Sequence, residues 1–282
     1  GDRFSNLIAS KPSMRRFALP GHGFVAWFSM LPWLVPTLGC EPTASKKPTA
    51  LVVFAASSMT EAMREVEEQF EKAHPTLDVQ LQFGGSQALR LQIEQGAPAD
   101  LFVSASEAHT RALERSRMVF AKKVIAGNEL VLIVPRENPA GIERFEDLTR
   151  AERIVLGAKE VPIGAYTEEL FDRSREVFGD AFADAVAGKV VSREHNVRLV
   201  RAKVELGEAD AAIVYRTDVI ASEGGSIIMI PIPRNLRTRA EYSAAIVGRP
   251  GEVANPGEEA FLSFLRSPAG QAILVRHGFG AR

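Results

Sequence analysis

The first strand–helix unit of the chain begins with the residues Leu51-Val52-Val53-Phe54-Ala55, which are followed by Ala56-Ser57-Ser58-Met59. Such a continuous apolar run is typical of a strand that is buried on both faces. The next apolar residues recur at three- and four-residue spacing and predict an amphipathic helix: Met59, Met63, Val66, Phe70 and Ala73. His74-Pro75 ends this helix. A buried strand joined to an amphipathic helix predicts a βα unit of a parallel sheet.

The same alternation of strands and helices continues along the chain. Strands are expected at 79–83, 100–103, 129–135, 153–157, 189–191, 211–215, 227–232 and 242–247. Helices are expected at about 87–95, 107–115, 145–150, 166–178, 197–206, 256–266 and 268–277. The pattern predicts an α/β protein whose sheets are largely parallel and are flanked by helices. The second set of strands, from residue 153 onward, is not expected to join the first sheet.

Composition limits the class of protein. The 282 residues allow one large or two modest domains. The chain carries 34 Lys and Arg against 35 Asp and Glu, so its net charge of -1 argues against a nucleic-acid partner, which requires a basic excess. A hydrophobic content of 46% excludes a disordered chain. Because Cys40 is the single cysteine, no intramolecular disulfide and no cysteine-pair metal or redox site can form.

Residues 1–49 are expected to be an extension, an export signal and a linker. The basic stretch Met14-Arg15-Arg16 precedes a mostly apolar run at 24–39, which is the pattern of a secretory signal. Thr37-Leu38-Gly39-Cys40 resembles a bacterial lipobox, in which the cysteine is lipidated and becomes the new N-terminus. In the alternative interpretation the signal is cut elsewhere or remains as an anchor, and Cys40 has no role. Both interpretations place the mature protein in the periplasm or elsewhere outside the cytoplasm.

Enzyme signatures are absent from the sequence. It contains no GxSxG elbow, no HExxH helix, no GxxxxGK[ST] phosphate loop and no GxGxxG after the first strand. The five histidines are scattered singly, which does not suggest a metal centre. We therefore expect neither catalysis nor a cofactor.

Small uncharged residues share one kind of position, the turn between the carboxyl end of a strand and the next helix. These turns are Ser57-Ser58, Gly84-Gly85-Ser86, Val161-Pro162-Ile163-Gly164 and His195-Asn196-Val197. Open α/β sheets bind ligands at such carboxyl edges. Helix amino ends add free N–H donors and a partial positive charge, which suit a small anion. Taken singly, Ser58, Ser86 and Asn196 are better explained as ordinary helix N-caps than as ligand contacts.

Considered together, these motifs resemble those of the periplasmic molybdate-binding proteins of bacterial ABC importers, over the chain from about residue 50 to the C-terminus. The resemblance rests on several motifs: Phe54-Ala55-Ala56-Ser57-Ser58-Met59-Thr60, Gln92-Ile93-Glu94-Gln95-Gly96-Ala97-Pro98-Ala99-Asp100-Leu101-Phe102, Gly127-Asn128-Glu129-Leu130-Val131, Val161-Pro162-Ile163-Gly164-Ala165-Tyr166, Asn196-Val197-Arg198 and Ile213-Val214-Tyr215. It implies a class II periplasmic binding protein, with two α/β lobes, two crossing segments and a ligand cleft between the lobes. The implied limits are 50–128 and 219–282 for the first lobe and 129–218 for the second.

The resemblance also implies the ligand and its contacts. Molybdate, or the similar tungstate, would be held by the hydroxyls of Ser58, Ser86 and Tyr215 and by the main-chain N–H groups of Ile163 and Val197. Ser57 is a further candidate donor, and no metal beyond the oxyanion is implied. The implied partners are the membrane permease subunits of the importer, with the binding protein itself a monomer. The family often has alanine where this chain has Ile163, which could change the size of the cavity.

A donor-only site has a chemical reason. Molybdate at neutral pH is a dianion without a proton, so donors alone satisfy it, whereas phosphate keeps a proton that needs an acceptor. Sulfate has the same charge and shape at smaller size and remains the alternative ligand. Two other functions stay open at this point: a sensor domain of the same fold, and an exported hydrolase with Ser58 or Ser86 as nucleophile and His195 as base. Iron capture is less favoured, because Tyr166, Tyr215 and Tyr242 are far apart in the sequence.

Overall fold

The computed structural model describes residues 48–222, 224–249 and 251–280. The expected export signal and Cys40 lie outside these ranges. In the described part of the chain, no helix is both long and apolar enough to cross a membrane.

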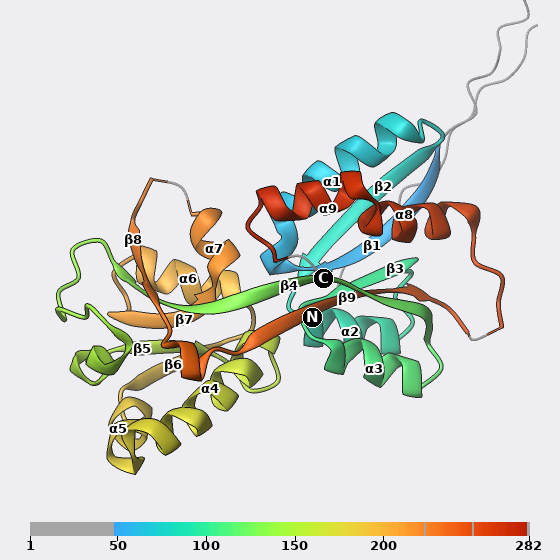
Figure 1. Cartoon of the computed structure of the whole chain (residues 1–282). Helices are drawn as coiled ribbons and strands as arrows, with labels where there is room; N and C mark the ends of the chain where they lie inside the picture. The colour runs from blue at the N-terminus through green and yellow to red at the C-terminus, as the bar shows by residue number, and fades with distance from the viewer. Residues whose placement is uncertain (1–47, 223, 250, 281–282) are drawn as a thin grey trace, which may run out of the picture. The chain divides into compact units, whose positions relative to one another are not determined.

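The first βα units form one half of the sheet, as the sequence predicts. The elements are β1 (Thr49–Ala56), η1 (Ser57–Met59), α1 (Thr60–Ala73), β2 (Leu77–Gly84), α2 (Ser86–Glu94), β3 (Leu101–Ser104) and α3 (Glu107–Arg115). β1 lies between β2 and β3 and is parallel to both. α1 buries its predicted stripe, which includes Met63, Val66 and Phe70. α1 packs with the C-terminal helices α8 (Pro256–Arg266) and α9 (Pro268–Arg276) on one face of the sheet, and α2 and α3 cover the other face (Figure 1). We call this part the first lobe.

A second set of βα units follows. Its elements are η2 (Phe145–Arg150), β5 (Ile154–Gly157), α4 (Pro162–Phe178), α5 (Asp180–Ala187), β6 (Val190–Glu194), α6 (Val197–Glu205), β7 (Ala211–Tyr215), α7 (Arg216–Ile220) and β8 (Ile227–Pro231). β5 lies between β6 and β7 and is parallel to both. We call this part the second lobe. The arrangement repeats that of the first lobe, a central parallel strand with a helix leading away from each carboxyl end.

Two long strands connect the lobes. β4 (Val119–Pro135) pairs with β9 (Arg239–Val247) along its first part and with β7 and β8 along its last part. Figure 1 shows β4 and β9 running side by side between the lobes. The pairings of β4 and the pairing of β3 with β9 are antiparallel, so the parallel pairs are those of β1 in the first lobe and of β5 in the second.

The strand order corrects one expectation. The second set of strands does join the first, in a nine-stranded sheet with the order β2-β1-β3-β9-β4-β7-β5-β6, in which β8 pairs with β4 beside this path. The reason is that β4 begins ten residues before the predicted strand at 129 and is long enough to belong to both lobes. The α/β fold class itself is confirmed.

The lobe limits expected from the sequence remain a prediction, and strand pairing argues for one change. β8 pairs with β4 in the second lobe, although the expected boundary at 218 assigns it to the first. Two helices, α5 and α7, were not predicted, and α4 begins at Pro162 rather than at Tyr166. The earlier start of α4 matters, because it places the Val161-Pro162-Ile163-Gly164 turn in the first turn of a helix.

Candidate functional site

A small cavity lies where the carboxyl ends of the strands of both lobes meet. Its lining residues are Ala56, Ser57, Ser58, Gly84, Gly85, Ser86, Ala105, Val161, Pro162, Ile163, Asn196, Val197 and Tyr215. The volume of this cavity is only about 10 Å³. Pockets for drug-sized ligands measure about 300–1,000 Å³. The cavity in this closed arrangement therefore suits one small ion rather than an organic molecule.

Every site residue expected from the sequence lines this cavity. Ser57, Ser58 and Ser86 come from the first lobe, and Ile163, Val197 and Tyr215 come from the second. All six are buried. No lining residue carries a charge, so the polar groups of the cavity are hydroxyls, main-chain groups and the amide of Asn196. Among the described residues, no group of three or more His, Cys, Asp or Glu side chains is arranged to hold a metal ion.

Ser58 and Ser86 are not helix N-caps. Ser86 is the first residue of α2, whose N-cap is Gly85, and its Oγ accepts a hydrogen bond of 3.1 Å from the main-chain N–H of Ala105. The Ser58 Oγ lies 2.8 Å from the hydroxyl of Tyr242, which comes from β9. Asn196, by contrast, is a true N-cap, because its side chain accepts from the N–H of Leu199. The serine hydroxyls thus remain available to a ligand.

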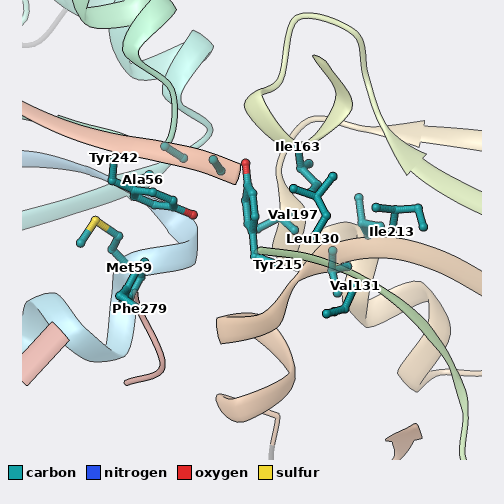
Figure 2. Packing of buried hydrophobic residues seen from close by; sticks show 14 of the residues in the cluster. Ala56, Met59, Leu130, Val131, Ile163, Val197, Ile213, Tyr215, Tyr242 and Phe279 are labelled. Atoms are coloured by element: carbon teal, nitrogen blue, oxygen red, sulfur yellow. The ribbon is translucent and has the colours of Figure 1, made fainter. Parts of the chain in front are cut away.

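Tyr215 provides the third hydroxyl of the cavity. The residue is 1% exposed, and its hydroxyl oxygen is buried with no hydrogen-bond partner in the protein. Burial raises the pKa of Tyr215 well above its ordinary value, so the hydroxyl keeps its hydrogen. Figure 2 shows the Tyr242 hydroxyl pointing toward the Tyr215 ring, and the ring centroids are 5.8 Å apart. A buried polar group without a partner is costly, which is the mark of a ligand position.

Two helix amino ends from the second lobe point main-chain donors at the cavity. The first N–H groups of a helix have no carbonyl partner within that helix. In α4 the first residue, Pro162, has no N–H, so Ile163 supplies the first donor. In α6 the Asn196 side chain caps Leu199 and leaves the N–H of Val197 free of that cap. The partial positive charge of both helix ends favours an anion.

Close packing explains the bulky residue at 163. A Cβ atom on Gly157 would lie 2.6 Å from Cγ2 of Ile163, so the isoleucine side chain packs against the space that this glycine leaves. A Cβ on Gly164 would lie 1.9 Å from the carbonyl oxygen of Ala158. The two glycines let the start of α4 press onto the end of β5.

Polar contacts outside the cavity join the two lobes. The Arg198 guanidinium of α6 donates to the carbonyl oxygen of Ser57 at 2.7 Å and also bonds Glu61 of α1. On another side, Gln87 Nε2 donates to the carbonyl oxygen of His195 at 2.7 Å. These contacts hold the lobes closed around the cavity.

Two titratable groups lie near these contacts, Asp218, which is buried, and His109, which is half-buried. Burial raises the pKa of Asp218, at the start of α7, to about 7, although Arg201 and Arg198 oppose the shift. Burial and the charge of Arg90 lower the pKa of His109 to about 4. His109 belongs to the first lobe and contacts the main chain of Glu160 in the second. The protonation of both groups is therefore coupled to the folded, closed structure.

Sequence reasoning missed the residues that support the cavity. Tyr242 was considered as part of an apolar strand and as one of three dispersed tyrosines, and the sequence does not indicate that its hydroxyl contacts Ser58. Arg198 and Asn128 appear in the motifs, but nothing in the sequence indicates what they contact. His195, the candidate base of the hydrolase alternative, has an exposed side chain and touches the site region through its carbonyl oxygen. Neither Ser58 nor Ser86 forms a hydrogen bond with a histidine within the described ranges.

The fold and the cavity define a two-lobed binding protein that encloses a small ligand between its lobes. Comparison with known proteins agrees with this description. The family model described as "Bacterial extracellular solute-binding protein" matches residues 51–280, and the chain belongs to this family. Solute-binding proteins of this family act outside the cytoplasm, and the family is not one of enzymes.

Individual relatives narrow the comparison. The molybdate-binding protein ModA of Haemophilus influenzae is 34% identical over 257 residues, which cover 88% of this chain and 96% of that protein. YvgL of Bacillus subtilis, named as an ABC transporter substrate-binding lipoprotein, is 32% identical and covers 85% of this chain and 89% of its own length. The solved structure of the periplasmic molybdate-binding protein of Azotobacter vinelandii matches with a TM-score of 0.68 at 20% identity. The match covers 82% of this chain and 99% of that protein. The last likeness concerns the fold, which is the class II binding-protein fold expected from the motifs.

Proposed function

We propose that the protein is the solute-binding component of an ABC importer, that it captures molybdate and, with comparable affinity, tungstate, and that it delivers them to a membrane permease. The observation that carries the proposal is the chemistry of the cavity. Three buried hydroxyls and two helix amino ends converge on a space for one small ion, and no lining side chain is charged. The relatives named for molybdate binding support the same ligand.

Molybdate fits this donor set because it has charge to accept hydrogen bonds and no proton to donate. Each hydrogen bond to a charged group contributes about 1.5–3 kcal/mol net. Four or five such bonds, less the cost of removing water from the dianion, correspond to dissociation constants in the micromolar to nanomolar range, or about -8 to -12 kcal/mol. No arginine or lysine is needed in the cavity for this affinity.

Closure follows from the division of the donors. Ser58 and Ser86 belong to the first lobe, and Tyr215, Ile163 and Val197 belong to the second, so neither lobe alone surrounds the anion. A ligand that contacts both lobes binds the closed state more tightly and shifts the population toward it. We infer that the protein acts as a monomer, catalyses no reaction and has no nucleic-acid partner.

Calorimetry with molybdate, tungstate and sulfate tests the proposal. We expect Ser86→Ala and Tyr215→Phe each to weaken molybdate binding by about 10- to 100-fold, the loss of one charge-assisted hydrogen bond. Tyr215→Phe removes a hydroxyl that has no partner in the protein, so the unliganded variant should unfold at the same temperature or a higher one. Ser243→Ala, which changes a buried serine bonded to Thr110 and not lining the cavity, is the matched control. Tight binding of sulfate but not of molybdate would refute the assignment of the ligand.

We further propose that Cys40 is lipidated and anchors the protein to the membrane surface. The lipobox-like residues before Cys40 and the name of the Bacillus subtilis relative support this. Labelling cells with radioactive palmitate should mark the protein, and Cys40→Ala should abolish the label. A label that persists in the variant would exclude this anchor.

A further inference from the structure

A second cavity lies at the hinge, where β4 and β9 connect the lobes and meet the last residues of the first lobe. Its volume is about 270 Å³. Its described lining residues are Gly127, Asn128, Glu129, Arg216, Arg237, Thr238, Arg239, Gly278 and Gly280. We call it the hinge pocket. Three of these residues are arginines and one has a carboxylate, so the lining carries a net positive charge, unlike that of the cavity between the lobes.

Two of the arginines are not used by the fold. Arg216 is the first residue of α7, Arg237 lies just before β9, and both are exposed. Among the described residues, neither guanidinium has a hydrogen-bond or ion-pair partner. A guanidinium presents five N–H donors in a planar fork that matches phosphate and carboxylate groups. A single exposed arginine needs no explanation, but two that line one pocket favour a molecule with more than one anionic group.

The hinge pocket is built from both lobes. Gly278 follows α9 of the first lobe, has φ +88° and packs so closely on Ile220 of α7 that a Cβ atom would overlap that side chain. Gly280 exchanges two main-chain hydrogen bonds with Gly127 of β4, at 2.8 and 3.0 Å. The end of the first lobe is thereby fixed against the hinge and against the helix that begins with Arg216. A molecule in this pocket would contact both lobes.

A chain of hydrogen bonds joins the hinge pocket to the cavity between the lobes. Asn128 lines the hinge pocket, and its Nδ2 donates to the hydroxyl oxygen of Tyr242 at 3.3 Å. The same hydroxyl lies 2.8 Å from the Oγ of Ser58, which lines the cavity. Phe279, between the two terminal glycines of the pocket, packs edge-on against the Tyr242 ring (Figure 2). The two sites are therefore separated by only a few residues that are in contact with one another.

We propose that the hinge pocket is a second anion site, which binds a small molecule with two or more phosphate or carboxylate groups and favours the closed arrangement of the lobes. A ligand that contacts both lobes binds the closed arrangement more tightly than an open one, in which its partners are farther apart. By reciprocity, this ligand and molybdate should each strengthen the binding of the other by the same factor. The net positive charge of the pocket offsets the repulsion between the two anions. The coupling to molybdate rests on the proposed function, whereas the anion site itself does not.

Calorimetry with inorganic pyrophosphate, on the full chain in buffer without metal ions, tests the inference. Citrate is titrated separately, so that ligands with carboxylate groups are distinguished from those with phosphate groups. The test variant carries Arg216→Gln and Arg237→Gln together, which removes the two unpaired cations. Arg234→Gln is the matched control, because Arg234 is an exposed arginine of η3 (Arg234–Leu236) that does not line the pocket.

We expect the double variant to bind pyrophosphate at least about tenfold more weakly than the unmodified protein, the effect of one or more lost charge-assisted hydrogen bonds. Arg234→Gln should bind it as the unmodified protein does. Saturating pyrophosphate should lower the dissociation constant of molybdate about fivefold, at the lower end of typical coupling between sites, and this effect should disappear in the double variant. Both variants should unfold at the temperature of the unmodified protein, since the altered side chains are exposed.

Three results would overturn the inference. The first is binding of neither pyrophosphate nor citrate, and the second is equal binding of pyrophosphate by the unmodified protein and the double variant. The third is a molybdate affinity that pyrophosphate leaves unchanged or lowers. Failure of the proposed function looks different, since molybdate would then not bind even without pyrophosphate, while pyrophosphate binding would still depend on the two arginines.

Discussion

Replacement of Gly85 by alanine should block closure of the lobes without disturbing either lobe. Gly85 has φ -65° and ψ 135°, a conformation that alanine adopts without strain. Its missing Cβ, however, would lie 2.4 Å from the carbonyl oxygen of His195, in the opposite lobe. A second contact, 2.6 Å to the Gln87 amide, is with a flexible side chain that can move. The obstacle is therefore the backbone of the other lobe.

The required movement sets the size of the effect. Ordinary contact begins at 3.4 Å, so the lobes must separate by 3.4 minus 2.4, or 1.0 Å, at this point. A separation of this size breaks or stretches the hydrogen bonds from the second lobe to the anion. Loss of two of them removes about 3–6 kcal/mol, equivalent to a roughly 10²- to 10⁴-fold rise in the dissociation constant of molybdate.

The assay combines calorimetry with thermal unfolding of the unliganded protein. Gly85→Ala should bind molybdate far more weakly but unfold at an unchanged or slightly higher temperature, because alanine lowers the entropy of the unfolded chain. Gly188→Ala is the control, since Gly188 is helical, with φ -66°, and its Cβ would meet nothing closer than 3.4 Å. If Gly85→Ala binds molybdate within about threefold of the unmodified protein, either the closed arrangement or the division of donors between the lobes is wrong.

Two further predictions concern pH. Burial raises the pKa of Asp218 in the folded protein to about 7; Arg201 and Arg198 oppose this shift, and Glu61 adds to it. The protonated carboxyl therefore stabilises the fold at low pH, and this contribution to stability is lost as the pH rises from about 4 to 7. Asp218→Asn should therefore raise the free energy of unfolding, measured with urea, by a few kcal/mol more at pH 8 than at pH 4. This size follows from about 1.4 kcal/mol per pKa unit. An equal effect at both pH values would contradict the prediction. The pKa of His109 is lowered to about 4, so its contribution is present above its ordinary pKa of about 6.5 and is lost as pH falls through 6.5 to 4. The unmodified protein should therefore lose more of its free energy of unfolding between pH 7 and pH 5 than His109→Gln does, measured with urea, whereas the same slope in both proteins would exclude this residue as the cause.

The site could be predicted from sequence because its residues follow strands directly. Ser58, Ser86, Ile163 and Val197 each stand at a strand–helix turn, and in a parallel sheet such turns meet at one edge. The pattern of apolar residues is enough to locate these turns. Local order along the chain therefore identified the cavity even where the exact helix start, as at Pro162, was wrong.

The supporting contacts could not be predicted, because they depend on residues brought together by long-range pairing. Tyr242 is separated from Ser58 by 184 positions and looks like any residue of an apolar strand. The length of β4 was underestimated because its first half, from Val119 to Asn128, mixes lysines with apolar residues where it pairs with β9. Pairing partners, unlike burial, leave no periodic signal in a single strand.

β4 has a consequence for how the molecule loses its structure. This strand is hydrogen-bonded to β9 in the first lobe and then to β7 and β8 in the second, so it cannot be withdrawn from one sheet without weakening the other. Neither half can be excised as an independent fragment, and heat should melt both in a single cooperative transition. A ligand bound by the few turns around the cavity should then stabilise both lobes against unfolding. It should also slow cleavage by any protease that acts on the unfolded chain.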